Sequence, residues 1–384
     1  MSYLRFDKTQ MTNLQDSLFK EFLITSRSGA YCSTTLVGCN IRKYHGLLVV
    51  PIPDMDDENH VLLSSLDETV VQHGAEFNLG LHKYQGDNYS PKGHKYISSF
   101  EWVKVPTWTY RIGGVVLQKE ISYGVHDSRL YVRYTLLEAH SRTTLRLKPF
   151  LAFRSVRQWT HENQTANTNY EEVENGIGMR LYEGYPTLYM QMSRKAEFHY
   201  GPDWYRGLEY PKERERGYDS LEDLLVPGYF EIDIKKGESV VFSASMQKEN
   251  PRRLTQMMNA EIEPRLPLDS FYHCLMHAAP LVQMPRQGHV HRNARPDAKH
   301  RRNRRIRGLY ENCREGYSRL HGRQASKRKN IRNGAARCAA VGDDMYTDVW
   351  TRGVAQGLLR EIRSLAPGHH GLHCQRRPSE PLRA

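Results

Sequence analysis

A chain of 384 residues with a formal charge of +12 is long enough for roughly two or three domains. No run approaches the roughly 18 consecutive apolar residues that a membrane helix needs, and the first residues carry no secretory apolar segment. We therefore expect a cytoplasmic protein with no membrane partner. The six cysteines lack CxxC spacing, which favours free thiols over a disulfide framework.

The charge is distributed unevenly along the chain. Residues 286–384 contain 23 of the 55 Lys and Arg residues but only 8 of the 43 Asp and Glu residues. Residues 1–285 are therefore mildly acidic, and the basic character belongs to the C-terminal segment. Two different kinds of sequence are joined in this chain.

The first segment with a clear pattern follows a weakly helical stretch, residues 1–20, in which Leu14, Leu18 and Phe19 are spaced for one helix face. Residues 21–51 are rich in glycine and small side chains, which allow close backbone approach, and they end in an apolar run that predicts a buried strand over 47–50.

Polar and aromatic residues directly precede this strand, at Arg42, Lys43, Tyr44 and His45. On an extended backbone Arg42 and Tyr44 share one face, while Lys43 and His45 share the other. A guanidinium beside an aromatic ring suits an uncharged, hydroxyl-rich ligand such as a sugar. The same residue types also occur as edge packing and surface ion pairs.

Residues 61–244 alternate short β-prone runs with turn signals. The clearest hairpin joins 107–112 to 115–121 through Gly113 and Gly114, because two glycines allow the positive φ angles of a tight turn. Many short strands without intervening helices predict antiparallel sheets packed as a sandwich. The other strands are predicted at 61–63, 69–72, 77–81, 129–137, 144–153, 187–192, 228–234 and 239–244.

Two further groups of polar residues are candidates for function. Trp159, His161 and Glu162 place hydrogen-bonding groups beside an indole, an arrangement typical of a carbohydrate platform or of a simple turn. Residues 209–223 alternate acidic with basic side chains, which indicates a loop of mutual ion pairs or one that borders a ligand. The sequence predicts no metal site and no cofactor.

Three ordered motifs within about the first 280 residues resemble one known family. They are Gly29-Ala30-Tyr31 with Arg42-x-Tyr44-His45-Gly46, then Pro149 to Arg154 with Thr160 to Asn163, and Trp204-Tyr205 with Glu209 to Phe230. The pattern is similar to the amino-terminal domain of bacterial and archaeal glycogen debranching enzymes of the amylo-alpha-1,6-glucosidase type.

This resemblance implies a large two-sheet β-sandwich and an activity on alpha-1,6 branch points of glycogen or related branched alpha-glucans. Its implied sugar-facing residues are Arg42, Tyr44, His45, Trp159, His161 and Glu162. Helical patterns at 253–262 and 268–279 fit the linker that leads to a catalytic (α/α) barrel in that family. No counterpart of the barrel follows, so we expect a groove-forming part that is inactive alone, and we name no catalytic residue.

The Arg-rich segment cannot bury enough apolar surface to offset its ordering entropy and is predicted to be largely disordered. It is open to three interpretations: an arm that binds nucleic acid, a solvated linker, or a frame change shortly after residue 279. The few aromatic residues argue against nucleic acid as a partner, and we favour the frame change. The predicted fold is mainly β, with a sandwich over 1–250, a helical linker over 251–285 and this tail over 286–384. The sequence does not reveal the oligomeric state.

Overall fold

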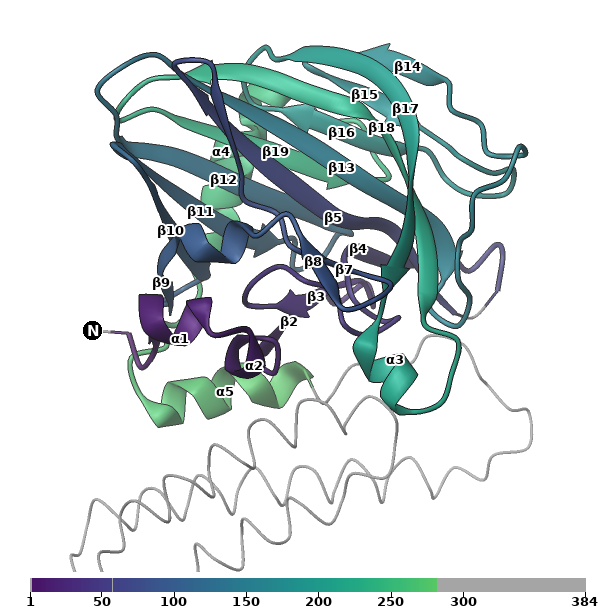
Figure 1. The fold of residues 1–384 in the computed structure, drawn as a ribbon, viewed down its shortest axis with the longest axis horizontal. Helices are drawn as coiled ribbons and strands as arrows, with labels where there is room; N and C mark the ends of the chain where they lie inside the picture. Colours follow the sequence, from purple (N-terminus) through teal and green to yellow (C-terminus); the bar gives the residue numbers. More distant parts are fainter. Residues whose placement is uncertain (1, 57, 282–384) are drawn as a thin grey trace, which may run out of the picture. The chain divides into compact units, whose positions relative to one another are not determined.

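A computed structural model describes residues 2–56 and 58–281 of the protein, all of which belong to the unit Met1–His289. In this part of the chain two antiparallel sheets pack face to face, which confirms the predicted β-sandwich (Figure 1). The tail predicted over 286–384, with its three interpretations, lies outside the described residues, and the predicted domain boundaries remain predictions.

One sheet has nine strands within the described residues. Their spatial order is β1 (Leu4–Asp7), β9 (Ile97–Trp102), β10 (Pro106–Ile112), β11 (Val115–Tyr123), β12 (Arg129–Glu138), β19 (Ser239–Ser245), β16 (Leu188–Met192), β15 (Gly176–Met179) and β14 (Tyr170–Val173).

The other sheet has ten strands in the same part of the chain. Their spatial order is β2 (Glu21–Thr25), β3 (Tyr31–Thr35), β4 (Gly46–Pro51), β5 (Asn59–Gln72), β13 (Thr143–Ser155), β18 (Leu221–Ile234), β17 (Glu197–Glu209), β7 (His82–Tyr84) and β8 (Asn88–Ser90), and β6 (Ala75–Asn78) pairs with β5.

The period of two along each strand divides the apolar residues between the two faces of a sheet. On β12, Val132 and Tyr134 point into the core between the sheets, whereas Tyr131 points outward. There it packs on Leu254 and Met258 of α4 (Leu254–Ile262). The outer face of the nine-stranded sheet is therefore covered in part by α4, a helix that follows the sandwich in the chain.

The predicted hairpin is confirmed, since Ile112 of β10 pairs with Val115 of β11 and Gly113 adopts a φ of 56°. The predicted strands at 61–63 and 69–72 form one continuous strand, β5. Polar residues in its middle break the apolar pattern, and one of them, Glu68, is buried together with its partners. Glu68 accepts a hydrogen bond from the Tyr134 hydroxyl at 2.6 Å and pairs with Lys119 at 2.5 Å.

The helices lie mostly at the two ends of the described chain (Figure 1). Those predicted at 253–262 and 268–279 are confirmed as α4 and as α5, which begins at Phe271. The weak prediction of a helix over residues 1–20 is corrected. This segment contains β1 and two short helices, and Phe19 is 64% exposed. Within residues 2–56 and 58–281 no helix is both long and apolar enough to cross a membrane. Besides α4, the helices of the described residues are α1 (Lys8–Thr12), α2 (Leu14–Ser17), α3 (Pro211–Glu215) and α5 (Phe271–Leu281), and the 3-10 turns are η1 (Gly93–Tyr96) and η2 (Pro251–Arg253).

Candidate functional site

Three loops of the ten-stranded sheet meet and form the candidate site. The first loop is residues 41–45, between β3 and β4; the second, 156–163, follows β13; the third, 210–220, contains α3. We call them the three-loop cluster. Lys212 of the third loop donates its backbone N–H to the carbonyl of Ile41 at 3.0 Å. Arg154, at the end of β13, donates from Nη1 to the carbonyl of Lys43, also at 3.0 Å.

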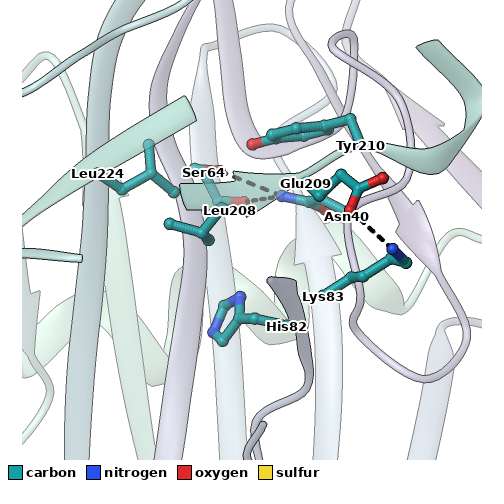
Figure 2. A pocket seen from close by; sticks show the side chains of 8 residues that line it. All are labelled: Asn40, Ser64, His82, Lys83, Leu208, Glu209, Tyr210 and Leu224. Carbon is teal, nitrogen blue, oxygen red and sulfur yellow. Dashed lines mark hydrogen bonds and ion pairs between the residues drawn. The ribbon is translucent and has the colours of Figure 1, made fainter. Parts of the chain in front are cut away.

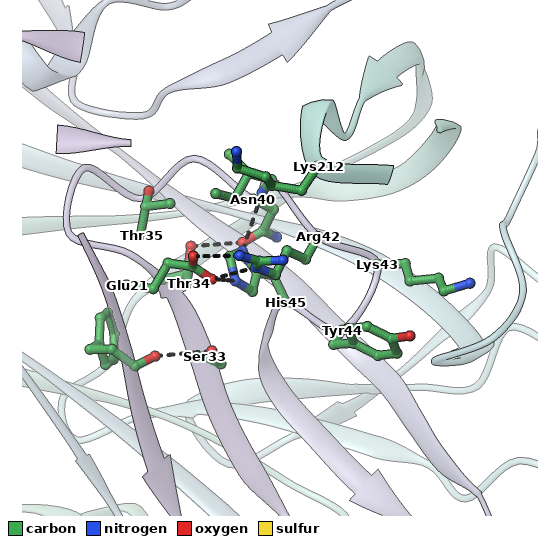
Figure 3. Close-up of polar contacts among 12 residues, drawn as sticks. Glu21, Ser33, Thr34, Thr35, Asn40, Arg42, Lys43, Tyr44, His45 and Lys212 are labelled. Atoms are coloured by element: carbon green, nitrogen blue, oxygen red, sulfur yellow. Dashed lines mark hydrogen bonds and ion pairs between the residues drawn. The ribbon is translucent and has the colours of Figure 1, made fainter. Parts of the chain in front are cut away.

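The first loop is a turn, which corrects the prediction of an extended backbone there. The N–H of His45 donates to the carbonyl of Arg42 at 3.0 Å and reverses the chain. Arg42 and His45 therefore reach the same partner, Glu21 of β2, instead of pointing to opposite faces (Figure 3). Arg42 donates to Glu21 through Nε at 2.8 Å and through Nη2 at 3.1 Å, and His45 Nε2 lies 2.9 Å from the Glu21 carboxylate.

The hydrogen bonds of His45 define its tautomer and the charge of Glu21. The backbone N–H of Ile41 donates to His45 Nδ1 at 3.2 Å, so the proton on Nε2 is the one directed at Glu21. Burial raises the pKa of Glu21, but the hydrogen bonds from His45 and Arg42, together with the positive charge of Arg42, outweigh burial and lower it to about 2. Arg42 and His45 thus fix the turn, and their contact with sugar remains a prediction.

Tyr44 borders a second apolar region, on the outer face of the ten-stranded sheet. Its backbone is held by the Tyr31 hydroxyl, which donates to the Tyr44 carbonyl at 2.9 Å. Its half-buried ring packs on this region together with that of Trp159. We call the region the outer aromatic cluster; its buried members are Tyr31, Val49, Val61, Phe150, Ala152, Val156, Leu208, Tyr210, Leu224 and Val226, and its partly buried members are Leu23, Tyr44, Tyr84, Trp159 and Tyr205.

Trp159 is held by contacts on several sides. The ring centroids of Trp159 and Tyr210 lie 4.5 Å apart. The Arg154 guanidinium lies 4.9 Å from the Trp159 ring centroid. The Trp159 Nε1–H donates to the carbonyl of Asp219 at 2.9 Å. The second loop therefore presents a half-exposed indole whose orientation is fixed by the third loop and by β13.

Arg154 and Glu222 form a buried ion pair beneath this indole, and neither was among the predicted sugar-facing residues. Arg154 is 3% exposed and Glu222 is fully buried. Arg154 Nη2 donates to Glu222 Oε2 at 3.2 Å and Nε donates to Oε1, while the Tyr210 hydroxyl donates to Oε2. Burial lowers the pKa of Arg154, but Glu222 and Tyr210 outweigh burial and raise it above its usual range. Both residues occur in the motif segments, which was the available signal in the sequence.

His161 and Glu162 lie on the exposed end of the second loop, and their side chains point to partners outside the outer aromatic cluster. Glu162 pairs with Arg206, which donates from Nη2 to Oε1 at 2.8 Å. His161 Nδ1 lies 3.7 Å from a carboxylate oxygen of Asp223. The structure thus groups Tyr44 with Trp159 and places Arg42 with His45, and His161 with Glu162, in two separate neighbourhoods.

The charged segment 209–223 forms the mutual ion pairs that the sequence indicates, among them Lys212–Glu215 and Arg214–Glu209, each at 2.7 Å. Part of this segment is nevertheless removed from solvent, which the alternation of charges did not indicate. Glu209, Glu213 and Glu222 are buried, because their carboxylates turn inward to meet donors from other elements. Lys83 of β7, for example, donates to Glu209 at 2.8 Å.

A small polar cavity lies next to this pair (Figure 2). Its volume of about 10 Å³ is about that of one water molecule and far below that of a sugar ring. Its lining residues are Asn40, Ser64, His82, Lys83, Leu208, Glu209, Tyr210 and Leu224. Among the described residues no group of three or more His, Cys, Asp and Glu side chains is placed to hold a metal ion.

Comparisons with known proteins identify the family. The family model described as glycogen debranching enzyme N terminal matches residues 20–241, whereas none of the curated proteins matches the chain. Among solved structures, a bacterial glucoamylase complexed with acarbose is 8% identical over 68% of this chain and 36% of its own, with a TM-score of 0.30. A proposed aldose 1-epimerase of Escherichia coli K12 is 12% identical over 59% of this chain and 98% of its own, also with a TM-score of 0.30. The chain thus spans about a third of the glucoamylase. The family model covers more than half of the sequence and all three loops of the site, so this protein belongs to the family of glycogen debranching enzyme amino-terminal domains.

Proposed function

We propose that the described domain binds a chain of glycogen or a related branched alpha-glucan at the outer aromatic cluster. It would form part of the substrate groove of an alpha-1,6-glucosidase of the glycogen debranching type, and it would not cleave the glycosidic bond itself. Family membership supports the substrate class. The observation that carries the proposal is that Tyr44 and Trp159, from two different loops, border one apolar patch.

The chemistry of this patch suits a neutral sugar. Pyranose rings present a C–H face that stacks on aromatic rings, while their hydroxyls exchange hydrogen bonds with surrounding polar groups. The half-exposed ring of Tyr205 belongs to the same cluster, and Lys148 Nζ donates to its hydroxyl at 2.8 Å. Lys43 lies beside Tyr44, with Nζ 5.8 Å from the ring centroid. Two lysine ammonium groups therefore lie beside the aromatic surface.

The carboxylates around the three-loop cluster support binding rather than cleavage. Glycoside hydrolysis needs a carboxylic acid that still holds its proton near neutral pH. Glu21 has its pKa lowered to about 2, and the hydrogen bond from Arg206 lowers the pKa of Glu162. Glu222 is engaged by Arg154 and Tyr210. Glu21 and Glu162 are therefore ionised near neutral pH, and the hydrogen bonds of all three carboxylates are already taken up by protein partners, which does not fit a poised proton donor.

Cosedimentation with glycogen tests the proposal, using the full chain and its Tyr44→Ala and Trp159→Ala variants. We expect each substitution to weaken binding by about tenfold, as the loss of one sugar-stacking ring implies. Tyr200→Ala is the matched control, because Tyr200 is a 47% exposed aromatic residue of β17 that does not belong to the outer aromatic cluster. Undiminished binding by the Tyr44→Ala, Trp159→Ala double variant would contradict the assigned surface.

Incubation with a branched limit dextrin tests the second half of the proposal. The full chain should release no glucose above the background of a heat-denatured sample. Release that persists through purification and disappears in the Trp159→Ala variant would overturn the non-cleaving role.

A further inference from the structure

Arg154 contacts two of the loops of the three-loop cluster and the strand β18 at once. Its Nη1 donates to the carbonyl of Lys43 in the first loop at 3.0 Å and to its neighbour Ser155 at 3.1 Å. Its Nε and Nη2 donate to Glu222. Its guanidinium lies on the ring of Trp159 in the second loop.

Glu222 adds a contact with the second loop and extends the contacts to the third. It accepts hydrogen bonds from the backbone N–H of Thr160 in the second loop, at 3.3 Å, and from the hydroxyl of Tyr210 in the third. Tyr210 in turn packs against Trp159. The pair Arg154–Glu222 is therefore the point at which the first, second and third loops are fixed relative to one another.

A second buried carboxylate holds the first loop from its other side. Glu213 of α3 is fully buried, and its Oε1 accepts the N–H of Lys43 at 3.3 Å. Both polar backbone groups of Lys43 are thus engaged, the carbonyl by Arg154 and the N–H by Glu213. Since Tyr44 is the next residue, these two contacts determine where its ring lies over the outer aromatic cluster.

The same two strands carry a second Arg–Glu pair that provides a comparison. Arg146 of β13 and Glu231 of β18 are linked by a hydrogen bond from Nε to Oε2 at 2.5 Å, with side chains 28% and 29% exposed. This pair ties β13 to β18 as Arg154–Glu222 does, but its hydrogen bonds go to Glu231 and Glu76 and to neither loop 41–45 nor loop 156–163. An Arg–Glu pair that joins β13 to β18 therefore need not be buried. The pair Arg154–Glu222 differs from the pair Arg146–Glu231 in its contacts with the loops.

We propose that Arg154, acting through Glu222, is a positioning residue that holds Tyr44 and Trp159 in the geometry that binds glucan. The inference rests on the proposed function. Only a guanidinium can fill the role, because its planar fork carries five N–H donors that reach a carboxylate and two carbonyls together. A lysine ammonium at this position supplies charge but cannot span these acceptors.

The test compares Arg154→Lys with the matched control Arg146→Lys in the full chain. Amide hydrogen exchange is measured for peptides covering 41–45 and 156–163, with peptides from β12 and β19 as the measure of an intact fold. We expect exchange at least about tenfold faster in both loops of Arg154→Lys, unchanged exchange in the two strands, and glycogen binding weakened by about tenfold. Arg146→Lys should match the wild type in all three measurements.

Tyr210→Phe gives a second route if Arg154→Lys fails to fold. It removes one donor to Glu222 and keeps the ring that packs on Trp159. We expect faster exchange in 156–163 and binding weakened about threefold. Acrylamide quenching of Trp159, taken as the difference from a Trp159→Phe background, should increase.

The outcomes separate this inference from the proposed function. Faster loop exchange with undiminished glycogen binding, or weaker binding with unchanged loop exchange, would overturn the positioning role and leave glucan binding intact. Absence of glycogen binding by the wild type would overturn the proposed function, and with it the role of Arg154 toward glucan.

Discussion

The carboxylate of Glu222 lies directly against the guanidinium of Arg154, and both side chains are almost completely removed from solvent. Removing one partner leaves the other charge buried without compensation. We expect Glu222→Ala to lower the free energy of unfolding by about 3–5 kcal/mol. Glu231→Ala, which breaks the partly exposed pair with Arg146 on the same strands, should lower it by at most about 1 kcal/mol. Urea unfolding followed by tryptophan fluorescence measures both, and equal losses would contradict the difference in burial.

The lowered pKa of Glu21 predicts a loss of stability in acid. A carboxyl whose pKa is lower in the folded than in the unfolded protein contributes stability above its unfolded value, here 4.5, and loses it as pH falls toward about 2. The full contribution is of the order of 3 kcal/mol. The difference in free energy of unfolding between wild type and Glu21→Gln should therefore be constant above pH 5 and shrink steadily below it. A difference that stays constant down to pH 2.5 would refute the assignment.

Gly46 lies where β4 approaches its neighbours too closely for a side chain. A Cβ atom at this position would lie 2.8 Å from Val49 Cγ2 and 2.9 Å from Val61 Cγ1. Gly46→Ala should lower the free energy of unfolding by about 1–3 kcal/mol through overpacking. Part of this loss should be recovered in a Val61→Ala background, because the smaller side chain frees the space. Gly201→Ala, which meets no atom within 4 Å, is the control and should change stability by less than about 0.5 kcal/mol.

Two cysteines should be inert in the folded protein. Cys32 and Cys39 are completely buried, and burial raises the pKa of each thiol to about 12. At pH 8 the reactive thiolate is then on the order of one part in ten thousand. Iodoacetamide should modify neither residue in the native protein and both in denaturant, as peptide mapping by mass spectrometry would detect. Rapid alkylation of Cys32 or Cys39 without denaturant would show that the sandwich opens readily.

Local signals in the sequence were sufficient to predict the elements whose structure depends on residues close by in the chain. The Gly113-Gly114 turn, the regular alternation of β12 and the helical spacing of α4 each needed only a short window of residues. β17 was missed because its period of two is interrupted. Its register shifts between Tyr200 and Asp203 and again between Tyr205 and Leu208, so no window shows a clean alternation.

The candidate site was less predictable because its contacts are distant in sequence. Arg42 and Glu21 are 21 residues apart, and Arg154 and Glu222 are 68 apart. No local pattern predicts that Arg42 pairs with Glu21 or Arg154 with Glu222. Arg42 was therefore expected to be available to a ligand, and Glu222 was taken as part of a charged loop. Tyr44 and Trp159 were named from residue type and family motif, and it is their common position on one apolar patch that only the fold reveals.

The position of β19 has a consequence for how the protein is made. It is the last described strand in the chain, yet it lies in the middle of the nine-stranded sheet, between β12 and β16. Until Ser239–Ser245 has left the ribosome, both neighbours carry unpaired edges, and the sheet remains in two halves. A nascent chain must therefore keep the edges of β12 and β16 open to solvent and to other chains until synthesis has passed β19, which exposes it to aggregation and makes assistance by chaperones valuable.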